Sequence, residues 1–191
     1  GPLELGFDYF FGIPMANSGF HYFYLENDRP YGWDPNDPLI KVKDPADRSP
    51  TPQFPEKGQN TYGGAKKAHA LYDDQMTAKI FTEKAVKWIN RHKDEPFFLY
   101  LAPTNIHHPF TPHPRFTGTS KAGRYGDFTH ELDWMVGQIV DTVEKYNLTE
   151  NTLIIFTSDN GGMFNEGGKF SWKAGHRMNG DLLGFKFGVW E

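Results

Sequence analysis

The amino-acid sequence predicts an α/β fold with a mostly parallel sheet flanked by helices, and two observations lead to this prediction. Two long stretches repeat apolar residues at intervals of three and four, which is the spacing of an amphipathic helix. Each stretch is followed by a short apolar run, which is typical of a buried strand. Because strand, helix and strand follow one another with a long connection, we expect the two strands to be parallel, with a right-handed crossover.

Composition narrows the class of protein. The chain has 191 residues, which suits one domain, and 38% of them are hydrophobic and 16% aromatic, which is too apolar for a disordered chain. The formal net charge is −4 and basic residues do not cluster, so nucleic acid is not an expected partner. No apolar stretch approaches the roughly 18 residues of a membrane span. Cysteine is absent, which excludes disulfides and thiolate chemistry within these residues.

Residues 1–62 are expected to be rich in loops. Seven prolines lie between positions 30 and 55, and prolines at this density interrupt a long helix or a central strand. The segment also carries aromatic residues that need burial, among them Phe20, Tyr22, Phe23 and Tyr24. This combination favours an ordered excursion that bears function over a linker.

The first predicted helix covers residues 71–93. Its apolar face consists of Met76, Ile80, Phe81, Ala85, Trp88 and Ile89. The segment Asp94-Glu95-Pro96 ends this helix. The following run at 97–102, Phe-Phe-Leu-Tyr-Leu-Ala, is predicted to be a strand buried on both faces.

The second predicted helix covers residues 127–146. Its apolar stripe consists of Phe128, Leu132, Met135, Val136, Ile139, Val140 and Val143. The same periodicity places Glu131, Gln138 and Glu144 on the opposite, polar face. The run at 153–157, Leu-Ile-Ile-Phe-Thr, is predicted to be the second buried strand.

Polar residues follow both predicted strands. In α/β sheets ligands bind beyond the carboxyl ends of parallel strands, so the segments 103–109 and 158–162 are expected at one edge of the sheet. Asp159 and Asn160 offer a carboxylate and an amide oxygen, which are ligands that Ca²⁺ or Mg²⁺ prefers. Asp-Asn-Gly is also a common turn sequence, but its position at a strand end favours a metal-binding role.

Several basic residues are candidates for binding an anion. His107 and His108 could supply a general acid or a cation, or be structural histidines of a loop. Lys186 lies between two phenylalanines and suits a sulfate or phosphate oxygen if it is partly desolvated, although a lone lysine is ordinarily a solvated charge. His176 and Arg177 form a less specific pattern of the same kind.

Five segments together resemble a known family. They are Gly-Phe-Asp-Tyr-Phe-Phe-Gly at 6–12, the run 96–109 with His107-His108-Pro109, the segments 123–127 and 151–162, and Gly184-Phe185-Lys186 with the closing Trp190-Glu191. Their order and spacing resemble the formylglycine-dependent sulfatases, the arylsulfatase family of the alkaline phosphatase superfamily. Thr-Ser-Asp-Asn-Gly-Gly at 157–162 is the most specific of these segments.

The resemblance implies metal-dependent hydrolysis of sulfate esters. It implies a divalent cation, usually Ca²⁺, held by Asp159 and Asn160 together with an aspartate pair that these residues do not include. It also implies that His107 contacts the sulfate and helps the leaving oxygen to depart, and that Lys186 holds a sulfate oxygen. His108, Asn17 and Ser18 fall where the family has variable residues.

The resemblance also implies that catalytic parts lie elsewhere. The family nucleophile is a formylglycine made from Cys or Ser within a Cys/Ser-x-Pro/Ala-x-Arg motif, which by the resemblance precedes Gly1. Residues 1–191 are therefore expected to be the central part of a sulfatase-like catalytic domain, incomplete at both ends. The nucleophile-bearing N-terminal part and a smaller C-terminal domain are expected outside it, and this chain alone is expected to be inactive.

The substrate depends on loops such as 13–65 and 163–183. A sulfated carbohydrate is favoured, because the aromatic residues of this part of the chain could stack on sugar rings. Two alternatives remain: a phosphodiesterase or phosphonate hydrolase of the same superfamily, and a non-catalytic module that binds sulfated glycans. By family habit the protein is expected to be periplasmic or secreted, or lysosomal in a eukaryote, where Asn147-Leu148-Thr149 would be a glycosylation sequon.

Overall fold

The fold is described from a computed structural model that covers residues 1–14, 23–32, 36, 73–164 and 166–188. Most of the proline-rich segment lies outside these described residues. Asn17 and Ser18, which fall where the resembled family has variable residues, also lie outside them.

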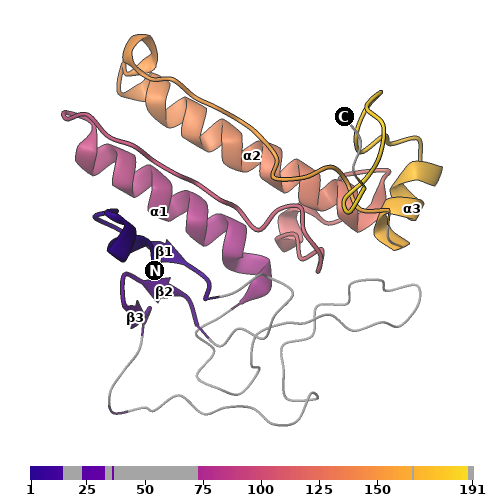
Figure 1. Cartoon of the computed structure of the whole chain (residues 1–191), viewed down its shortest axis with the longest axis horizontal. Helices are drawn as coiled ribbons and strands as arrows, with labels where there is room; N and C mark the ends of the chain where they lie inside the picture. Colours follow the sequence, from indigo (N-terminus) through magenta and orange to yellow (C-terminus); the bar gives the residue numbers. More distant parts are fainter. Residues whose placement is uncertain (15–22, 33–35, 37–72, 165, 189–191) are drawn as a thin grey trace.

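Two long helices, α1 (Thr77–His92) and α2 (Gly123–Lys145), form the main layer of the molecule. They lie side by side and run in the same direction (Figure 1). The buried side chains follow the predicted apolar stripes, with Phe81, Ala85 and Ile89 on α1 and Phe128, Met135 and Val143 on α2. Each large apolar side chain buried in this way stabilises the fold by about 1.5–3 kcal/mol. Both predicted helices are therefore confirmed.

The starts of the two helices differ from the predicted positions. A short 3₁₀ turn, η4 (Asp74–Met76), precedes α1, and the Asp73 carboxylate caps it by accepting a hydrogen bond from the Gln75 N–H at 3.0 Å. Residues 71 and 72 lie outside the described part of the chain. Helix α2 begins at Gly123 instead of 127. Its first turn contains two glycines, which are poor helix formers and add nothing to the apolar stripe, so the apolar periodicity does not indicate this start.

Three short strands form an antiparallel ribbon near the N-terminus. They are β1 (Phe11–Gly12), β2 (Leu25–Glu26) and β3 (Arg29–Pro30), in the spatial order β1-β2-β3. Phe11 lies opposite Glu26, and Leu25 lies opposite Pro30. The ribbon sits against α1 (Figure 1), where buried Tyr24 packs with Ala78, Phe81 and Met135.

A charged contact fastens this ribbon to α1. The Lys84 ammonium donates a hydrogen bond to the Glu26 carboxylate at 2.6 Å and lies over the rings of Phe11 and Tyr31. Burial by itself raises the pKa of Glu26, but the hydrogen bonds from Lys84 and Tyr9 outweigh it and lower the pKa below its usual value. The described residues 1–14 and 23–32 thus pack against the helices, while the rest of the segment predicted to be an ordered excursion lies outside the described residues.

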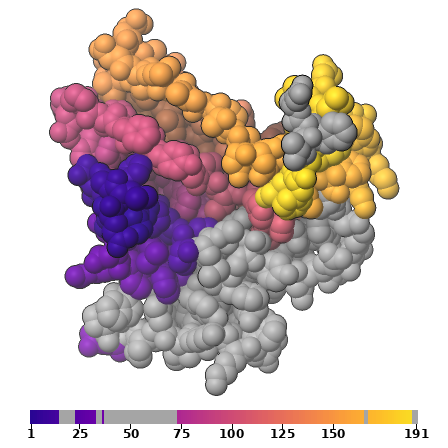
Figure 2. Space-filling view, in the orientation of Figure 1, coloured from indigo at the N-terminus to yellow at the C-terminus, as the bar shows by residue number. Residues whose placement is uncertain are grey.

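The two runs predicted as buried parallel strands are extended but unpaired among the described residues. Neither 97–102 nor 153–157 belongs to the described sheet. Both return along the helices in the same direction (Figure 1), and Figure 2 shows them, in pink and orange, at the surface. Phe98 and Tyr100 are each 73% exposed, and Ile155 is 76% exposed. The prediction that both faces of these runs are buried is wrong for the described residues.

The exposure pattern gives the physical reason. Along 97–102 the side chains alternate, with Phe97, Leu99 and Leu101 half-buried and Phe98, Tyr100 and Ala102 exposed. The helices cover one face of this extended segment, and the described residues place no layer over the other face. An apolar run is compatible with burial on both faces, but a sheet also needs paired neighbours and a second layer.

A second cluster of buried aromatic residues lies near the start of α2. Phe110, Tyr125 and Phe128 form it, and the rings of Phe110 and Tyr125 meet edge to face with centroids 5.4 Å apart. Ile106 and Met178 pack against this cluster. Two loops that are distant in sequence therefore rest on the same hydrophobic support.

Shorter helical elements complete the description. They are η1 (Pro2–Leu5), η5 (Pro114–Phe116), η6 (Thr149–Asn151) and α3 (Glu166–Lys173). Helix α3 packs beside the first part of α2 (Figure 1). Across the described ranges, every helix is too short or too polar to cross a membrane.

Candidate functional site

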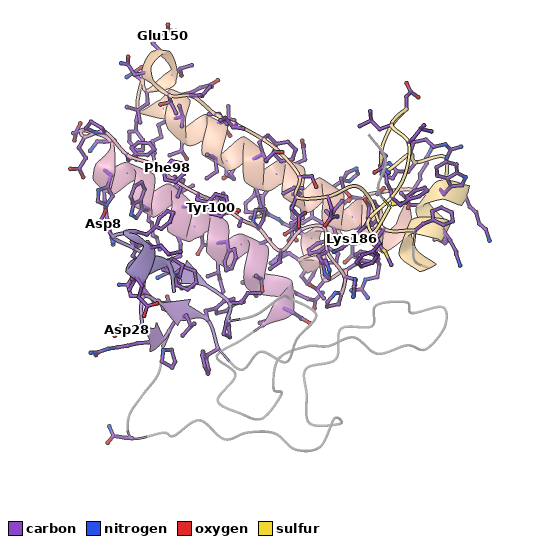
Figure 3. All side chains as sticks on the ribbon, in the orientation of Figure 1. Asp8, Asp28, Phe98, Tyr100, Glu150 and Lys186 are labelled. Atoms are coloured by element: carbon purple, nitrogen blue, oxygen red, sulfur yellow. The ribbon has the colours of Figure 1, made fainter. Side chains whose placement is uncertain are left out.

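The candidate residues gather at one end of the molecule. Both extended segments run toward the end where α2 begins and α3 lies (Figure 1). The segments 103–109 and 158–162 follow them there, as expected for the carboxyl ends of parallel strands. Figure 3 shows Lys186 in the same region, while Glu150 lies at the opposite end.

Lys186 is joined to the loop that carries Asp159 and Asn160. Its backbone N–H donates a hydrogen bond to the Gly162 carbonyl oxygen at 2.8 Å. Its side chain is half-buried, and the ammonium lies 5.6 Å from the centroid of the Phe187 ring. Because a partly desolvated ammonium attracts an anion more strongly than a hydrated one, this half-buried position favours anion binding by Lys186, which stays a prediction.

His107 and His108 lie against each other in the loop after the first extended segment. Their rings stack with centroids 4.3 Å apart. The His107 Nδ1 atom lies 2.6 Å from the His108 carbonyl oxygen. A carbonyl oxygen only accepts hydrogen bonds, so this contact is a hydrogen bond in which Nδ1 is the donor.

Electrostatics connect this histidine pair to Lys186. Burial lowers the pKa of His108, and the positive charges of His107 and Lys186 lower it further. Met178, which packs on the same aromatic cluster as Ile106 in the histidine loop, also lies against Gly162 of the loop bonded to Lys186. The structure therefore brings Lys186, the histidine pair and the loop 158–162 into one neighbourhood.

A buried carboxylate supports the loop that carries His107. Glu131 is 1% exposed, so the prediction that it lies on the polar face of α2 is wrong. The reason is that the loop after 102 folds over this side of the helix: Glu131 accepts hydrogen bonds from the His113 N–H and from Asn105 Nδ2, each at 3.0 Å. Asn105 Nδ2 also donates to the Phe128 carbonyl at 3.1 Å. Burial raises the pKa of Glu131, although both hydrogen bonds to it act in the opposite direction.

Asp159 and Asn160 are exposed in the loop after the second extended segment. Asn160 Nδ2 donates to the Gly161 carbonyl at 2.7 Å, so its amide oxygen is the atom that it can offer to a cation. The Ser158 hydroxyl donates to the Asn160 carbonyl at 2.8 Å and steadies the loop.

These two residues fit part of a calcium site. A carboxylate and an amide oxygen are suitable ligands, but Ca²⁺ takes about six to eight oxygens. Within the described ranges, His, Cys, Asp and Glu side chains do not gather in groups of three or more that could hold a metal. The remaining ligands of a cation here would come from other groups.

Asn179 joins the two loops of this region, and sequence reasoning did not single it out. Its Oδ1 accepts a hydrogen bond from the Gly162 N–H at 2.7 Å, and its Nδ2 donates to the Gly184 carbonyl at 2.5 Å. Gly184 has a φ of +86°, which favours glycine in this turn. In the sequence Asn179 is one asparagine in the glycine-rich stretch 161–180, and this position does not indicate which residues its side chain contacts.

A shallow pocket ends at Phe185, the residue before Lys186, and is lined by Trp172, Asn179, Gly180, Leu182, Leu183, Gly184 and Phe185. Arg177 lies on the Trp172 ring, 3.8 Å from its centroid, and donates a hydrogen bond to the Trp172 carbonyl at 3.1 Å. The His176 ring lies 5.5 Å from the Tyr125 ring. Anion binding by His176 and Arg177 stays a prediction.

Sequence comparison finds relatives over most of the chain. A family model described as Sulfatase matches residues 2–183. An N-acetylgalactosamine-6-O-sulfatase of Bacteroides thetaiotaomicron is 37% identical over 211 aligned residues, covering 98% of this chain and 41% of the relative. Human arylsulfatase H is 43% identical over 89 residues, covering 47% of this chain and 16% of the relative. Mouse N-acetylgalactosamine-6-sulfatase is 33% identical over 173 residues, covering 87% of this chain and 29% of the relative.

A solved structure is similar as well. It was described in connection with the metabolism of multiple glycosaminoglycans by Bacteroides thetaiotaomicron, and it superimposes with a TM-score of 0.80 at 36% identity. The match covers 98% of this chain and 43% of that chain. It confirms the α/β fold class, although strand pairing between 97–102 and 153–157 is not formed in the described part. The chain spans about two fifths of the length of the bacterial relative and of the solved structure.

Proposed function

Because this chain belongs to the sulfatase family, we propose that the protein containing it hydrolyses sulfate esters in a reaction that depends on a divalent cation. The observation that carries the proposal is the meeting of Lys186, the histidine pair 107–108 and the loop 158–162 at one end of the molecule. An ammonium, a proton donor and oxygen ligands for a cation are the groups that hold a sulfate ester and release its alcohol.

Two residues carry the catalytic roles in this proposal. Lys186 binds a sulfuryl oxygen, because its half-buried ammonium opposes the negative charge there. His107, when protonated, donates the proton on Nε2 to the leaving ester oxygen. The hydrogen bond from its Nδ1 to the His108 carbonyl holds the ring in a fixed orientation for that transfer.

Asp159 and Asn160 are proposed to hold the cation, which we assign as Ca²⁺, with Mg²⁺ as the alternative. The Asp159 carboxylate and the Asn160 amide oxygen provide two hard ligands. When bound, the cation supplies positive charge that offsets the charge on the sulfuryl oxygens.

We further propose that residues 1–191 form the central part of the catalytic domain and that the formylglycine lies outside them. These residues contain no cysteine. One segment, 120–124, reads Ser-Lys-Ala-Gly-Arg and so has the spelling Ser-x-Ala-x-Arg. Its Ser120 hydroxyl accepts a hydrogen bond from the Ala122 N–H at 3.0 Å, and its N–H donates to Asp127 Oδ1 at 2.9 Å. These contacts support a structural role for Ser120 ahead of α2.

A sulfated carbohydrate is the proposed substrate. Two of the similar proteins are named for sulfated N-acetylgalactosamine. The pocket that includes Phe185 offers the rings of Trp172 and Phe185, and aromatic rings can pack against the apolar faces of sugars. From the habit of the family, the protein is proposed to be periplasmic or secreted, or lysosomal in a eukaryote.

The test is release of sulfate by the full-length protein and by its Lys186→Ala and Asp159→Ala variants. We expect turnover that a chelator abolishes and that added Ca²⁺ restores. Each variant should lose about a hundredfold or more in kcat/KM, because removing one group that stabilises developing charge costs about 10²–10³-fold. The exposed residues Lys87 and Asp133 provide matched controls, and their alanine variants should keep wild-type rates.

Unchanged turnover in both variants would contradict the assignment of these residues. Binding of a sulfated glycan without any turnover, unaffected by either substitution, would favour the non-catalytic binding module instead.

A further inference from the structure

Asn179 occupies a fixed place between the two loops of the candidate site. The neighbouring Met178 packs on the buried aromatic cluster of Phe110, Tyr125 and Phe128. The Asn179 carbonyl accepts a hydrogen bond from the Leu182 N–H at 3.0 Å, which closes a turn toward Gly184. The backbone of Asn179 is therefore held by the core on one side and by a turn on the other.

The Asn179 side chain uses both ends of its amide. Oδ1 accepts a hydrogen bond from the N–H of Gly162, which lies two residues after Asn160. Nδ2 donates a hydrogen bond to the carbonyl of Gly184, which lies two residues before Lys186. A Cβ at Gly161 would lie 3.3 Å from Oδ1, and one at Gly162 would lie 3.2 Å from it. This closeness places the backbone of loop 158–162 directly against the Asn179 amide.

A second connection makes the geometry rigid. The Lys186 N–H bond to the Gly162 carbonyl links the same two loops through the backbone alone. One hydrogen bond leaves two loops free to pivot about it, whereas two bonds on different atoms fix their relative orientation. An anion that must touch both Lys186 and a cation at 159–160 depends on this orientation, because misplacement by about 1 Å costs about a hundredfold in rate.

We propose that Asn179 is a positioning residue that sets the separation between Lys186 and the cation ligands Asp159 and Asn160. This inference rests on the proposed function. Asn179 acts on Lys186 and on the cation ligands through the two loops that it joins. Its two hydrogen bonds serve different ends: the bond to Gly162 places the cation ligands, and the bond to Gly184 places Lys186.

The test compares Asn179→Ala and Asn179→Asp in the full-length protein. Aspartate keeps an oxygen that accepts the Gly162 N–H but has no N–H to donate to Gly184. The measurements are Ca²⁺ affinity by titration calorimetry, inhibition by inorganic sulfate, kcat and KM for an aryl sulfate, and the thermal unfolding midpoint. Asn151→Ala is the control, because Asn151 is exposed and adjoins Glu150 at the far end of the molecule (Figure 3).

Asn179→Ala should weaken both Ca²⁺ binding and sulfate inhibition by about tenfold, the scale of one lost hydrogen bond. Asn179→Asp should bind Ca²⁺ at least as tightly as the wild type but should be inhibited by sulfate about tenfold less strongly. Asn151→Ala should match the wild type in every measurement.

The inference is overturned if Asn179→Asp keeps wild-type sulfate inhibition, or if both variants lower only the unfolding midpoint. Either result would mean that the amide has a purely structural role. A wild-type protein that binds neither Ca²⁺ nor sulfate would overturn the proposed function, and this inference with it. A wild-type enzyme that is active and binds both, with unaltered Asn179 variants, would overturn this inference alone.

Discussion

The helices α1 and α2 and the two extended segments are all rich in apolar residues, yet their apolar side chains are buried to different extents. Phe128 on α2 is 1% exposed, whereas Phe98 in the first extended segment is 73% exposed. Each helix needs cover along a single stripe, which the other helix provides around Met135 and which Phe110 and Met178 provide around Phe128. A strand with apolar side chains on both faces needs two covering layers and paired neighbours. Burial therefore depends on the available partners as well as on the apolar content of a segment.

The largest expected effect tests this contrast with two phenylalanines in the 191-residue chain. Phe128→Ala should lower the free energy of unfolding by about 3–5 kcal/mol, because it removes a large buried side chain and leaves a cavity. Phe98→Ala should lower it by less than about 1 kcal/mol, since most of the Phe98 side chain is already in water. Urea unfolding measures both changes. Equal losses would mean that the outward face of 97–102 is covered, and the contrast would fail.

A smaller effect is expected at Glu131, which is polar but as buried as Phe128. Glu131→Gln turns one accepting oxygen into a donor that faces the His113 N–H or Asn105 Nδ2, at a cost of about 1–3 kcal/mol near neutral pH. It should also change the pH dependence of stability. The raised pKa means that the folded protein keeps a proton that the unfolded chain has lost. The free energy of unfolding of the wild type therefore falls as pH rises from about 4.3, the ordinary pKa of Glu, through the raised pKa.

Urea unfolding at a series of pH values checks this prediction. Glu131→Gln should show a flatter dependence on pH than the wild type over that window. The exposed Glu144 on the same helix is the matched control, and Glu144→Gln should keep the wild-type dependence. An unchanged slope in Glu131→Gln would show that this carboxyl does not titrate differently in the folded and unfolded states.

The sequence predicts the parts of this molecule that depend on local pattern. The spacing of Phe81, Ala85 and Ile89 is enough to identify α1, because one buried stripe determines an amphipathic helix. The burial of Glu131 depends on a loop that folds over α2 from elsewhere in the chain, so helical periodicity assigned it to the wrong face.

In the candidate site, too, the sequence predicts the residues with a local pattern and misses a residue whose role depends on distant contacts. Asp159, Asn160 and the histidine pair were predicted from their place at strand ends, and the structure brings their segments to one end of the molecule. Asn179 was missed because its role depends on the approach of Gly162 and Gly184, which lie on opposite sides of it in the sequence. The residues next to Asn179 in the sequence do not indicate these two hydrogen bonds.

We propose that Lys186, His107 and the loop 158–162 belong to a sulfate ester hydrolase. The most direct measurement is kcat/KM of the full-length protein, in the presence of Ca²⁺, for a sulfate ester and for the phosphate ester of the same alcohol. We predict a preference for the sulfate ester of at least about tenfold, a difference of about 1.4 kcal/mol in transition-state stabilisation. A preference for the phosphate ester would contradict the account and would identify a phosphodiesterase or phosphonate hydrolase instead.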